Sequence, residues 1–280
     1  MEYKKDFKIK PKEVRKDGSV LFTDGTNNVL PNQLACEAYG YKYDTETGTC
    51  VSFKPTIQLD KQLKEPSNTI KGVNNITNKG TSRSIINGTL NTTKGFNENC
   101  FINGTSNTIN NGINNATITG TYGKSKHTGE LTIGGGSFNS VAGERQYSIV
   151  QVSNKAEGND KTLYIEGDTV NENEITLPNN SITMYEVFVS GLCTGGSSGT
   201  LGHYKCEHHT GSVLSDDDGI LTKVAYATEA ISSSGTTGVV ALIVSTNGIF
   251  SIQVTGTANV NAEWHAVVKL YSLHSSRIEI

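Results

Sequence analysis

The densest group of potentially reactive side chains lies between His203 and His209. It contains three histidines and Cys206, which are side chains that bind transition metals. In an extended strand, successive side chains point to opposite faces, so His203 and His209 share one face, and Cys206 and His208 share the other. One strand therefore cannot surround a single ion with four ligands, although three copies of the chain around an axis could each supply one histidine. We expect no metal here, and His203 and His209 remain the only weak candidates.

Other candidate chemistry in the sequence is incomplete. The Asp-Asp-Asp-Gly run at 216–219 offers carboxylates to calcium, but it lacks the spacing and the distant glutamate of an EF-hand loop, so we interpret it as a turn. Cys193 has no base nearby in the sequence and fits a small buried residue. Hydrolysis of a glycosidic bond needs two carboxylates on a groove, and the central repeat contains essentially Glu98 alone. We expect no catalytic residues, no cofactor and no enzymatic activity.

The composition excludes two classes of partner. The 280 residues carry a net charge of −3 with a pI of about 6.1, which indicates no basic surface for nucleic acid. No apolar run reaches the ~18 residues that span a bilayer, so we expect no membrane insertion. The start of the chain lacks the apolar core of a signal peptide, and we expect folding in the cytoplasm that makes it. Few apolar residues, at 35%, and 30 glycines favour an all-β chain of short strands and tight turns.

A repeat occupies the middle of the chain. Glycines recur every sixteen residues, an isoleucine stands two residues before each of them, and asparagines keep the same period. The positions are Gly72, Gly88, Gly104 and Gly120; Ile70, Ile86, Ile102 and Ile118; and Asn75, Asn91 and Asn107. Sixteen residues hold two short strands and two turns, which make one coil of a flattened parallel β-solenoid. We predict such a solenoid, or β-roll, as a shaft over 61–128, with stacked isoleucines inside and ladders of asparagines.

The same repeat predicts association of the chain with itself. Each coil offers only one or two apolar side chains to its interior, and burying one isoleucine is worth ~1.5–3 kcal/mol. Ordering each residue costs roughly 1–2 kcal/mol in backbone entropy. So few contacts cannot hold sixteen residues per coil, and we expect two identical chains to join this one in a homotrimer.

The segment before the repeat, residues 1–60, looks like a small docking module. A charged arm precedes a tyrosine-rich stretch that is flanked by Cys36 and Cys50. Asn32 is a suitable N-cap for a short helix. The two cysteines could form a disulfide, but free thiols are the default in a reducing cytoplasm, so the pairing stays open.

Longer alternating strands characterise residues 129–280, after a Gly-Gly-Gly joint at 134–136. The run 239–244 is apolar on both faces, as in a central strand, and Asn247-Gly248 then indicates a hairpin turn. Further on, Trp264, Ala266, Val268 and Leu270 share a face opposite His265, Lys269 and Tyr271. About eight such strands predict an antiparallel, jelly-roll-like β-sandwich as the tip of the molecule.

The order of these features resembles the trimeric virion fibre proteins of tailed bacteriophages, of head-fibre or tail-fibre type. The matching stretches are Leu30–Cys50 with its LPNQ and CEAYGY runs, Asn68–Gly120, Gly134–Gly136, and Gly191–Thr200 with its GLCTGGSSGT run. The resemblance implies a fibre of the virion whose N-terminal region is seated in the capsid or tail and whose tip points outward. Two roles of the tip stay open, namely adhesion to host surface glycans or a purely structural capsid decoration that binds no ligand.

The roll alone is also similar to the heads of bacterial trimeric surface adhesins. Those proteins are secreted, and the start of this chain lacks a secretion signal. We therefore prefer the phage fibre over the adhesin.

Overall fold

The computed structural model describes residues 2–15, 17–45, 47–52, 68–167, 169–235, 237–244 and 247–275, with only the backbone of 241–244. The chain divides into two compact units, 1–64 and 65–280, which we take in turn. The regular structure among the described residues is β, apart from one helix of six residues.

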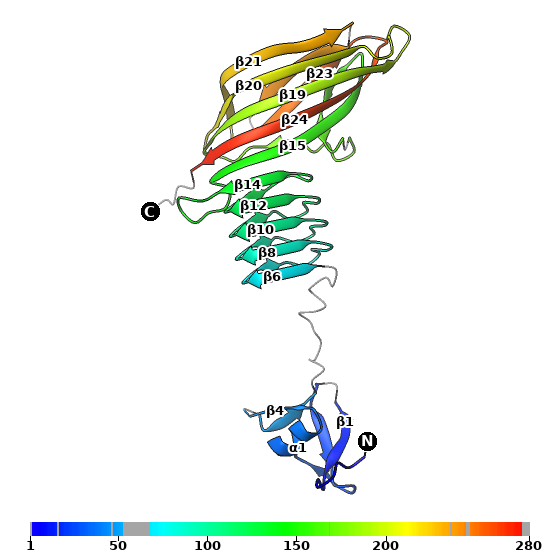
Figure 1. The fold of residues 1–280 in the computed structure, drawn as a ribbon, viewed down its shortest axis with the longest axis vertical. Helices are drawn as coiled ribbons and strands as arrows, with labels where there is room; N and C mark the ends of the chain where they lie inside the picture. The colour runs from blue at the N-terminus through cyan, green and yellow to red at the C-terminus, as the bar shows by residue number, and fades with distance from the viewer. Residues whose placement is uncertain are drawn as a thin grey trace. The chain divides into compact units, whose positions relative to one another are not determined.

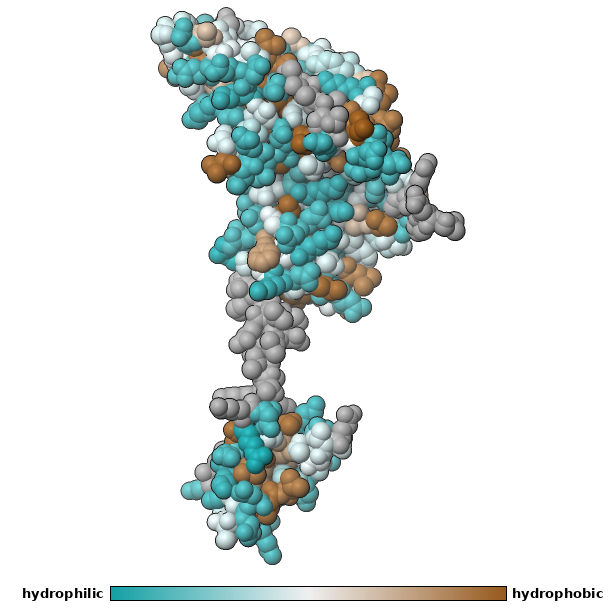
Figure 2. All heavy atoms as spheres, turned by 180° about the vertical axis from the view of Figure 1, so that it is seen from behind, coloured by the Kyte–Doolittle hydropathy of each residue, from teal (hydrophilic) through white to brown (hydrophobic). Residues whose placement is uncertain are grey.

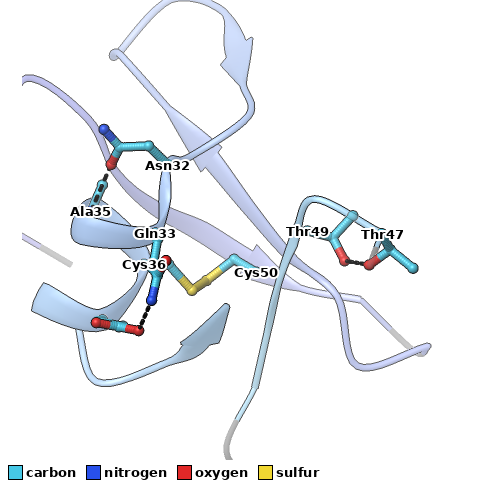
Figure 3. Close-up of a disulfide and its surroundings, with 8 residues drawn as sticks. Asn32, Gln33, Ala35, Cys36, Thr47, Thr49 and Cys50 are labelled. Atoms are coloured by element: carbon cyan, nitrogen blue, oxygen red, sulfur yellow. Dashed lines mark hydrogen bonds between the residues drawn. A yellow bond between two sulfur atoms is a disulfide. The ribbon is translucent and has the colours of Figure 1, made fainter. Parts of the chain in front are cut away.

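In the N-terminal unit, three short strands form an antiparallel sheet, a helix follows, and a two-stranded hairpin closes the unit. The elements are β1 (Lys10–Val14), β2 (Val20–Thr23), β3 (Asn28–Val29), α1 (Gln33–Ala38), β4 (Lys42–Asp44) and β5 (Thr49–Val51). Asn32 caps α1, since its side chain accepts a hydrogen bond from the Ala35 amide at 2.8 Å (Figure 3).

The core of this unit is very small. Its buried apolar residues are Val20, Phe22, Cys36 and Cys50, with tyrosine rings packed around them. Cys36 and Cys50 form a disulfide that joins α1 to β5 (Figure 3). A core of this size is too small to stabilise a domain of about 50 residues by itself, and such domains usually need a covalent or metal link. We infer that the disulfide supplies much of the stability of this unit.

Replacing both Cys36 and Cys50 by serine is expected to destabilise the N-terminal unit by about 3 kcal/mol, because the bond closes a loop of sequence separation 14. Hydrogen exchange of the amides in β2 and α1 measures the loss. Fluorescence of Trp264, the single tryptophan, serves as an internal control because it reports on the other unit. Cys206→Ser, at a free cysteine, is the matched variant and should leave exchange in the N-terminal unit unchanged.

The repeat forms a parallel β-solenoid with coils of sixteen residues, as predicted (Figure 1). Five longer strands stack in one sheet, and four two-residue strands stack in a second. The longer strands are β6 (Thr69–Val73), β8 (Ile85–Thr89), β10 (Phe101–Thr105), β12 (Thr117–Thr121) and β14 (Leu131–Gly135); the short ones are β7 (Ile76–Thr77), β9 (Thr92–Thr93), β11 (Thr108–Ile109) and β13 (Lys124–Ser125).

Isoleucines stack inside the solenoid. Ile70, Ile86, Ile102 and Ile118 occupy one register position in successive coils. The last three have no solvent exposure, whereas Ile70, in the first described coil, is 36% exposed. An asparagine ladder runs beside them: the Asn91 side chain donates to Asn75 at 3.0 Å and to the carbonyl of Gly104 at 2.9 Å, and Asn107 repeats this pattern.

The repeat glycines are required by both backbone conformation and space. Gly88 has φ of +109° and Gly104 has φ of +145°, a region that favours glycine. A Cβ at either position would lie 1.8–1.9 Å from the carbonyl oxygen of the glycine one coil further on. The sixteen-residue glycine period therefore reflects coils that touch backbone to backbone.

The C-terminal part continues the solenoid sheet without interruption. Antiparallel strands β15, β24, β19, β20 and β21 add successively to β14, and β17 pairs with β15, so that eleven strands form one sheet (Figure 1). Their bounds are β15 (Arg145–Glu157), β17 (Tyr164–Ile165), β19 (Ser181–Gly195), β20 (Tyr204–Ser215), β21 (Leu221–Ser234) and β24 (Asn261–His274). The expected glycine joint is part of this sheet, because Gly134 and Gly135 lie in β14.

A second, smaller antiparallel sheet packs on the long strands. It comprises β16 (Asp160–Thr162), β18 (Ile175–Thr176), β22 (Gly238–Val244) and β23 (Ile249–Gly256). One hydrophobic core joins the two sheets, with Val150, Val187 and Val268 from the long strands and Phe250 and Ile252 from β23. Buried residues alternate along β15, β19, β23 and β24, which leaves the other side of the long strands facing solvent. The edge strand β21 differs, since Leu221 is its one buried residue.

No helix in the described ranges is long and apolar enough to cross a membrane. On the face shown in Figure 2, hydrophilic side chains predominate and hydrophobic side chains form separate groups.

Candidate functional site

The two histidines that the sequence offered as weak metal candidates lie in different surroundings. His209 is buried: its Nε2 lies 3.1 Å from a Glu207 carboxylate oxygen, and its Nδ1 lies 3.1 Å from the Thr228 hydroxyl. Both ring nitrogens thus have partners within the chain, and burial lowers the pKa of His209. His203 lies in the turn before β20, against Gly235. Within the described ranges, no group of three or more His, Cys, Asp or Glu side chains could hold a metal ion.

The other residues considered from sequence also have structural surroundings. Cys193 is buried, and Cys100 is buried in the solenoid, where desolvation raises its thiol pKa. Asp216 accepts hydrogen bonds from the amides of Asp218 and Ile220, which forms the predicted turn. Glu98 lies on the solenoid surface, paired with Arg83.

A buried glutamate, Glu130, and a buried histidine, His127, lie where the last solenoid coil meets the second sheet. Oε2 of Glu130 accepts hydrogen bonds from the amides of Lys126 and His127, at 2.7 and 3.0 Å, and from the Ser125 hydroxyl. His127 bridges to β18, since its Nε2 accepts a hydrogen bond from the Thr176 amide at 2.9 Å. Burial alone would raise the pKa of Glu130, but His127 and these hydrogen bonds outweigh it and lower the pKa to about 2. The Glu130 carboxylate thus stabilises the contact between the last solenoid coil and the second sheet.

The lowered pKa of Glu130 predicts acid sensitivity. A carboxyl whose pKa is lower when folded contributes stability above its unfolded pKa of 4.5 and loses it as pH falls towards 2. The contribution at neutral pH is on the order of 3 kcal/mol. Glu130→Gln should remove most of it and flatten the dependence of unfolding free energy on pH in this window. Urea titrations at pH 2–7 measure this; Glu157→Gln, at an exposed position, should retain the wild-type profile.

The solvent side of β15, β24, β19 and β20, which we call the outer face, is patterned in rows. Register pairs Ser153 with His265, His265 with Ser190, and Ser190 with Cys206, so that these four side chains form one row across the strands. The neighbouring row contains Lys155, Glu263, Leu192 and Tyr204, with an ion pair of 2.9 Å between Lys155 and Glu263.

A groove of about 860 Å³ follows these two rows. We call it the outer groove; its lining residues are Ser153, Asn154, Lys155, Gly167, Thr169, Ser190, Gly191, Leu192, Tyr204, Cys206, Glu263, Trp264 and His265. On the outer face, the small side chain of Ser190 lies between the larger side chains of Leu192 and His265. Gly191 faces the opposite side, where a Cβ would lie 2.6 Å from the Trp264 ring, so its lack of a side chain makes room for this tryptophan. The volume falls within the ~300–1,000 Å³ range of small-molecule sites.

An aromatic pair borders the outer groove. The rings of Phe188 and His208 stack with centroids 4.3 Å apart and planes at 9°. They form the row next to Ser190 and Cys206, and Phe188 is 39% exposed. A sugar ring presents apolar C–H groups on its faces and hydroxyls at its edge. A partly exposed aromatic pair beside serine, histidine and charged side chains suits a carbohydrate, although Lys269 also lies over the Phe188 ring, with its Nζ 5.0 Å from the ring centroid.

Sequence analysis missed the outer groove because its residues come from four strands far apart in the chain. Only the alternation around His265 was visible, with polar residues on the side opposite Trp264. The pairing of β19 with β24 joins Ser190 to His265 across 75 residues, and no local pattern in the sequence indicates it.

Comparisons with known proteins give a consistent but distant set of neighbours. No family model matches the chain, and no curated protein matches it. The solved structures that it resembles are phage tailspikes. One is the tailspike gp49 of Acinetobacter baumannii bacteriophage Fri1, a capsular polysaccharide depolymerase, at 10% identity and a TM-score of 0.28, covering 73% of this chain and 41% of that one.

A second is the tailspike of Acinetobacter baumannii phage AM24, at 8% identity and a TM-score of 0.27, covering 75% of this chain and 50% of that one. A third is Pantoea stewartii WceF, described as a glycan biofilm modifying enzyme with a tailspike-like parallel β-helix fold, at 12% identity and a TM-score of 0.17, covering 73% of this chain and 35% of that one. The chain thus spans half or less of the length of these proteins.

The expectation that the chain is not an enzyme is corrected by this finding. Two of the neighbours are described as a depolymerase and a glycan-modifying enzyme. The repeat offers essentially one carboxylate, Glu98. The fold places a further carboxylate, Glu263, in the outer groove outside the repeat.

Proposed function

We propose that the chain is a structural fibre of a bacteriophage virion, of head-fibre or tail-fibre type, that binds polysaccharides of the host surface through the outer groove. The observation that carries the proposal is the groove itself. It places the Lys155–Glu263 pair, His265 and Tyr204 next to an exposed aromatic stack, on the same sheet that continues from a β-solenoid. The distant structural neighbours include phage tailspikes, which is consistent with a phage fibre.

The fibre is proposed to be a homotrimer. Inside the solenoid, the buried cluster consists of Ile86, Cys100, Ile102, Ile109, Ala116 and Ile118. This is little apolar burial for more than fifty ordered residues, each of which costs roughly 1–2 kcal/mol in backbone entropy. Meanwhile Ile85, Phe96 and Ile133 remain 44%, 63% and 44% exposed. Contact with identical chains would bury such residues.

The N-terminal unit is proposed to attach the fibre to the capsid or tail. It has its own disulfide-linked core, and it exposes two leucines, Leu30 before α1 at 81% and Leu34 within α1 at 69%. Exposed leucines on so small a unit suit contact with another protein.

The proposal is tested with the full chain on an array of bacterial capsular and cell-wall polysaccharides. We expect binding to at least one of them, strengthened by three linked copies. Viscosity of the bound polysaccharide, followed during incubation, records whether it is also cleaved. A decoration without a ligand would show no binding at any concentration that keeps the protein soluble, and this result would overturn the adhesive role. Antibodies against the N-terminal unit locate the fibre on intact virions.

A further inference from the structure

A stripe of exposed apolar side chains crosses the solenoid and the antiparallel strands on the same side of the continuous sheet. In register, Ile85 pairs with Phe101, Phe101 with Thr117, Thr117 with Leu131, and Leu131 with Ile149. All of them stand on the face opposite to the buried isoleucine column, because they neighbour Ile86, Ile102 and Ile118 in sequence.

A second file runs beside the first. Thr119 pairs with Ile133, Ile133 with Tyr147, Tyr147 with Tyr271, and Tyr271 with Met184. The rings of Tyr147 and Tyr271 lie 4.9 Å apart. We call the two files together the central stripe; its apolar members are Ile85, Phe101, Leu131, Ile133, Tyr147, Ile149, Met184 and Tyr271. It lies to one side of the outer groove, separated from it by the row of Phe188 and His208.

Several apolar side chains of the central stripe are exposed to solvent. Met184 is 58% exposed, Ile85 and Ile133 are each 44% exposed, and Tyr271 is 40% exposed. The strands that carry the stripe, β8 to β19, follow one another along the stacking direction of the coils (Figure 1). On β12 the two files contain Thr117 and Thr119, and the other solenoid strands from β8 to β14 contribute apolar side chains. Contiguous apolar patches of this kind usually mark an interface. Because this stripe follows the stacking direction, its partner must extend equally far in that direction.

A second copy of this chain meets that requirement, and the charges of the stripe favour it. At the upper end of the first file, Lys269 and Glu186 stand side by side, 3.2 Å apart, where β24 and β19 pair. Both are partly exposed. When three such surfaces meet around an axis, the Lys269 of each copy can face the Glu186 of the next, so opposite charges meet at every contact. Because both signs are present side by side, the patch is complementary to its own copy.

We propose that the central stripe is the surface through which three copies of the chain meet along a common axis. This inference rests on the proposed trimer and adds which part of the sheet is turned towards the three-fold axis. The outer groove lies further along the same face of the long strands, beyond the row of Phe188 and His208, and we expect it to stay open to polysaccharide because the contact is limited to the stripe. Side chains of the stripe meet their own equivalents in layers, as expected around a three-fold axis.

Two variants test the stripe. Ile133→Glu and Met184→Glu place a charge in it; both positions are exposed in the single chain, so the fold should persist. We expect light scattering to show a loss of the trimer mass for both, with unchanged Trp264 fluorescence. Leu192→Glu, at a position of the outer groove with 49% exposure, is the matched control and should remain trimeric.

Cysteine cross-linking gives an independent geometric measurement. A disulfide between identical positions forms only if the two Cα atoms come within about 7 Å, which occurs only near a symmetry axis. Met184→Cys should therefore yield linked chains after mild oxidation, whereas Leu192→Cys should not, each measured against the wild-type background from Cys206.

The possible results distinguish failure of the proposed trimer from failure of the central stripe as its contact surface. A wild-type chain that is monomeric at micromolar concentration overturns both the trimer and the stripe. A wild-type trimer whose Ile133→Glu and Met184→Glu variants keep their mass, without cross-links at Met184→Cys, overturns the stripe alone. A polysaccharide that covered the stripe instead would protect Tyr271 from iodination only in the presence of that ligand, and this too would contradict the inference.

Discussion

Gly104→Ala is expected to unfold the solenoid, with a loss of more than about 4 kcal/mol of unfolding free energy, a size that requires a specific steric cause. The cause is direct: the new Cβ would stand 1.8 Å from the Gly120 carbonyl oxygen and 3.0 Å from the Asn107 side chain. Neither can move without breaking the ladder between coils. Circular dichroism during urea titration measures the change.

Gly112→Ala is the matched control for this prediction. Gly112 also has a positive φ, +72°, but a Cβ there would meet nothing within 4 Å. Its cost should be limited to the backbone strain of an alanine in this conformation, about 1–2 kcal/mol. Equal effects of the two substitutions would show that the coils do not touch where the structure places them.

Ser190→Trp is expected to abolish binding of polysaccharide, with a loss of affinity of at least ten-fold, because the indole would fill the floor of the outer groove. Ser190 is exposed there, between His265 and Cys206 in register, so the larger side chain can point into the groove without disturbing the core. Titration of the full chain with the polysaccharide found on the array measures the affinity.

Ser190→Ala keeps the groove open and should bind within about ten-fold of wild type, whereas Ser190→Trp should show no saturable binding. Only one hydroxyl is lost in Ser190→Ala, and a neutral hydrogen bond contributes roughly 0.5–1.5 kcal/mol. Both variants should have the same assembly mass as wild type. If Ser190→Trp binds as wild type does, the ligand site lies elsewhere on the molecule.

The solenoid could be predicted from sequence because its contacts recur at a fixed, short interval along the chain. Ile86 pairs with Ile102 sixteen residues later, and the same interval separates Gly88 from Gly104. The spacing in the sequence therefore gives the register between neighbouring strands. The tight approach of these glycines also explains why the period shows no slip there. The cap by Asn32 was predictable for a similar reason, since its bond reaches only three residues along the chain.

The outer groove and the order of the long strands could not be predicted in this way. β15 pairs with β24, and Arg145 faces Leu273 across 128 residues. Alternation indicates which side of a strand is buried, but it carries no information on which strand lies next to it. The sequence also indicated a separate tip after a glycine joint. In the structure Gly134 pairs with both Gly120 and Gln146, so this glycine belongs to the sheet that runs through both parts.

This shared sheet has a mechanical consequence. A load applied at the far strands must pass through each pair of neighbouring strands in series, so the pair with the fewest bonds yields first. β14 and β15 are joined by four residue pairs, whereas β15 and β24 are joined by thirteen. Pulled along the stack, the molecule should rupture where parallel strands give way to antiparallel ones, and it should leave the coils below and the long strands above intact.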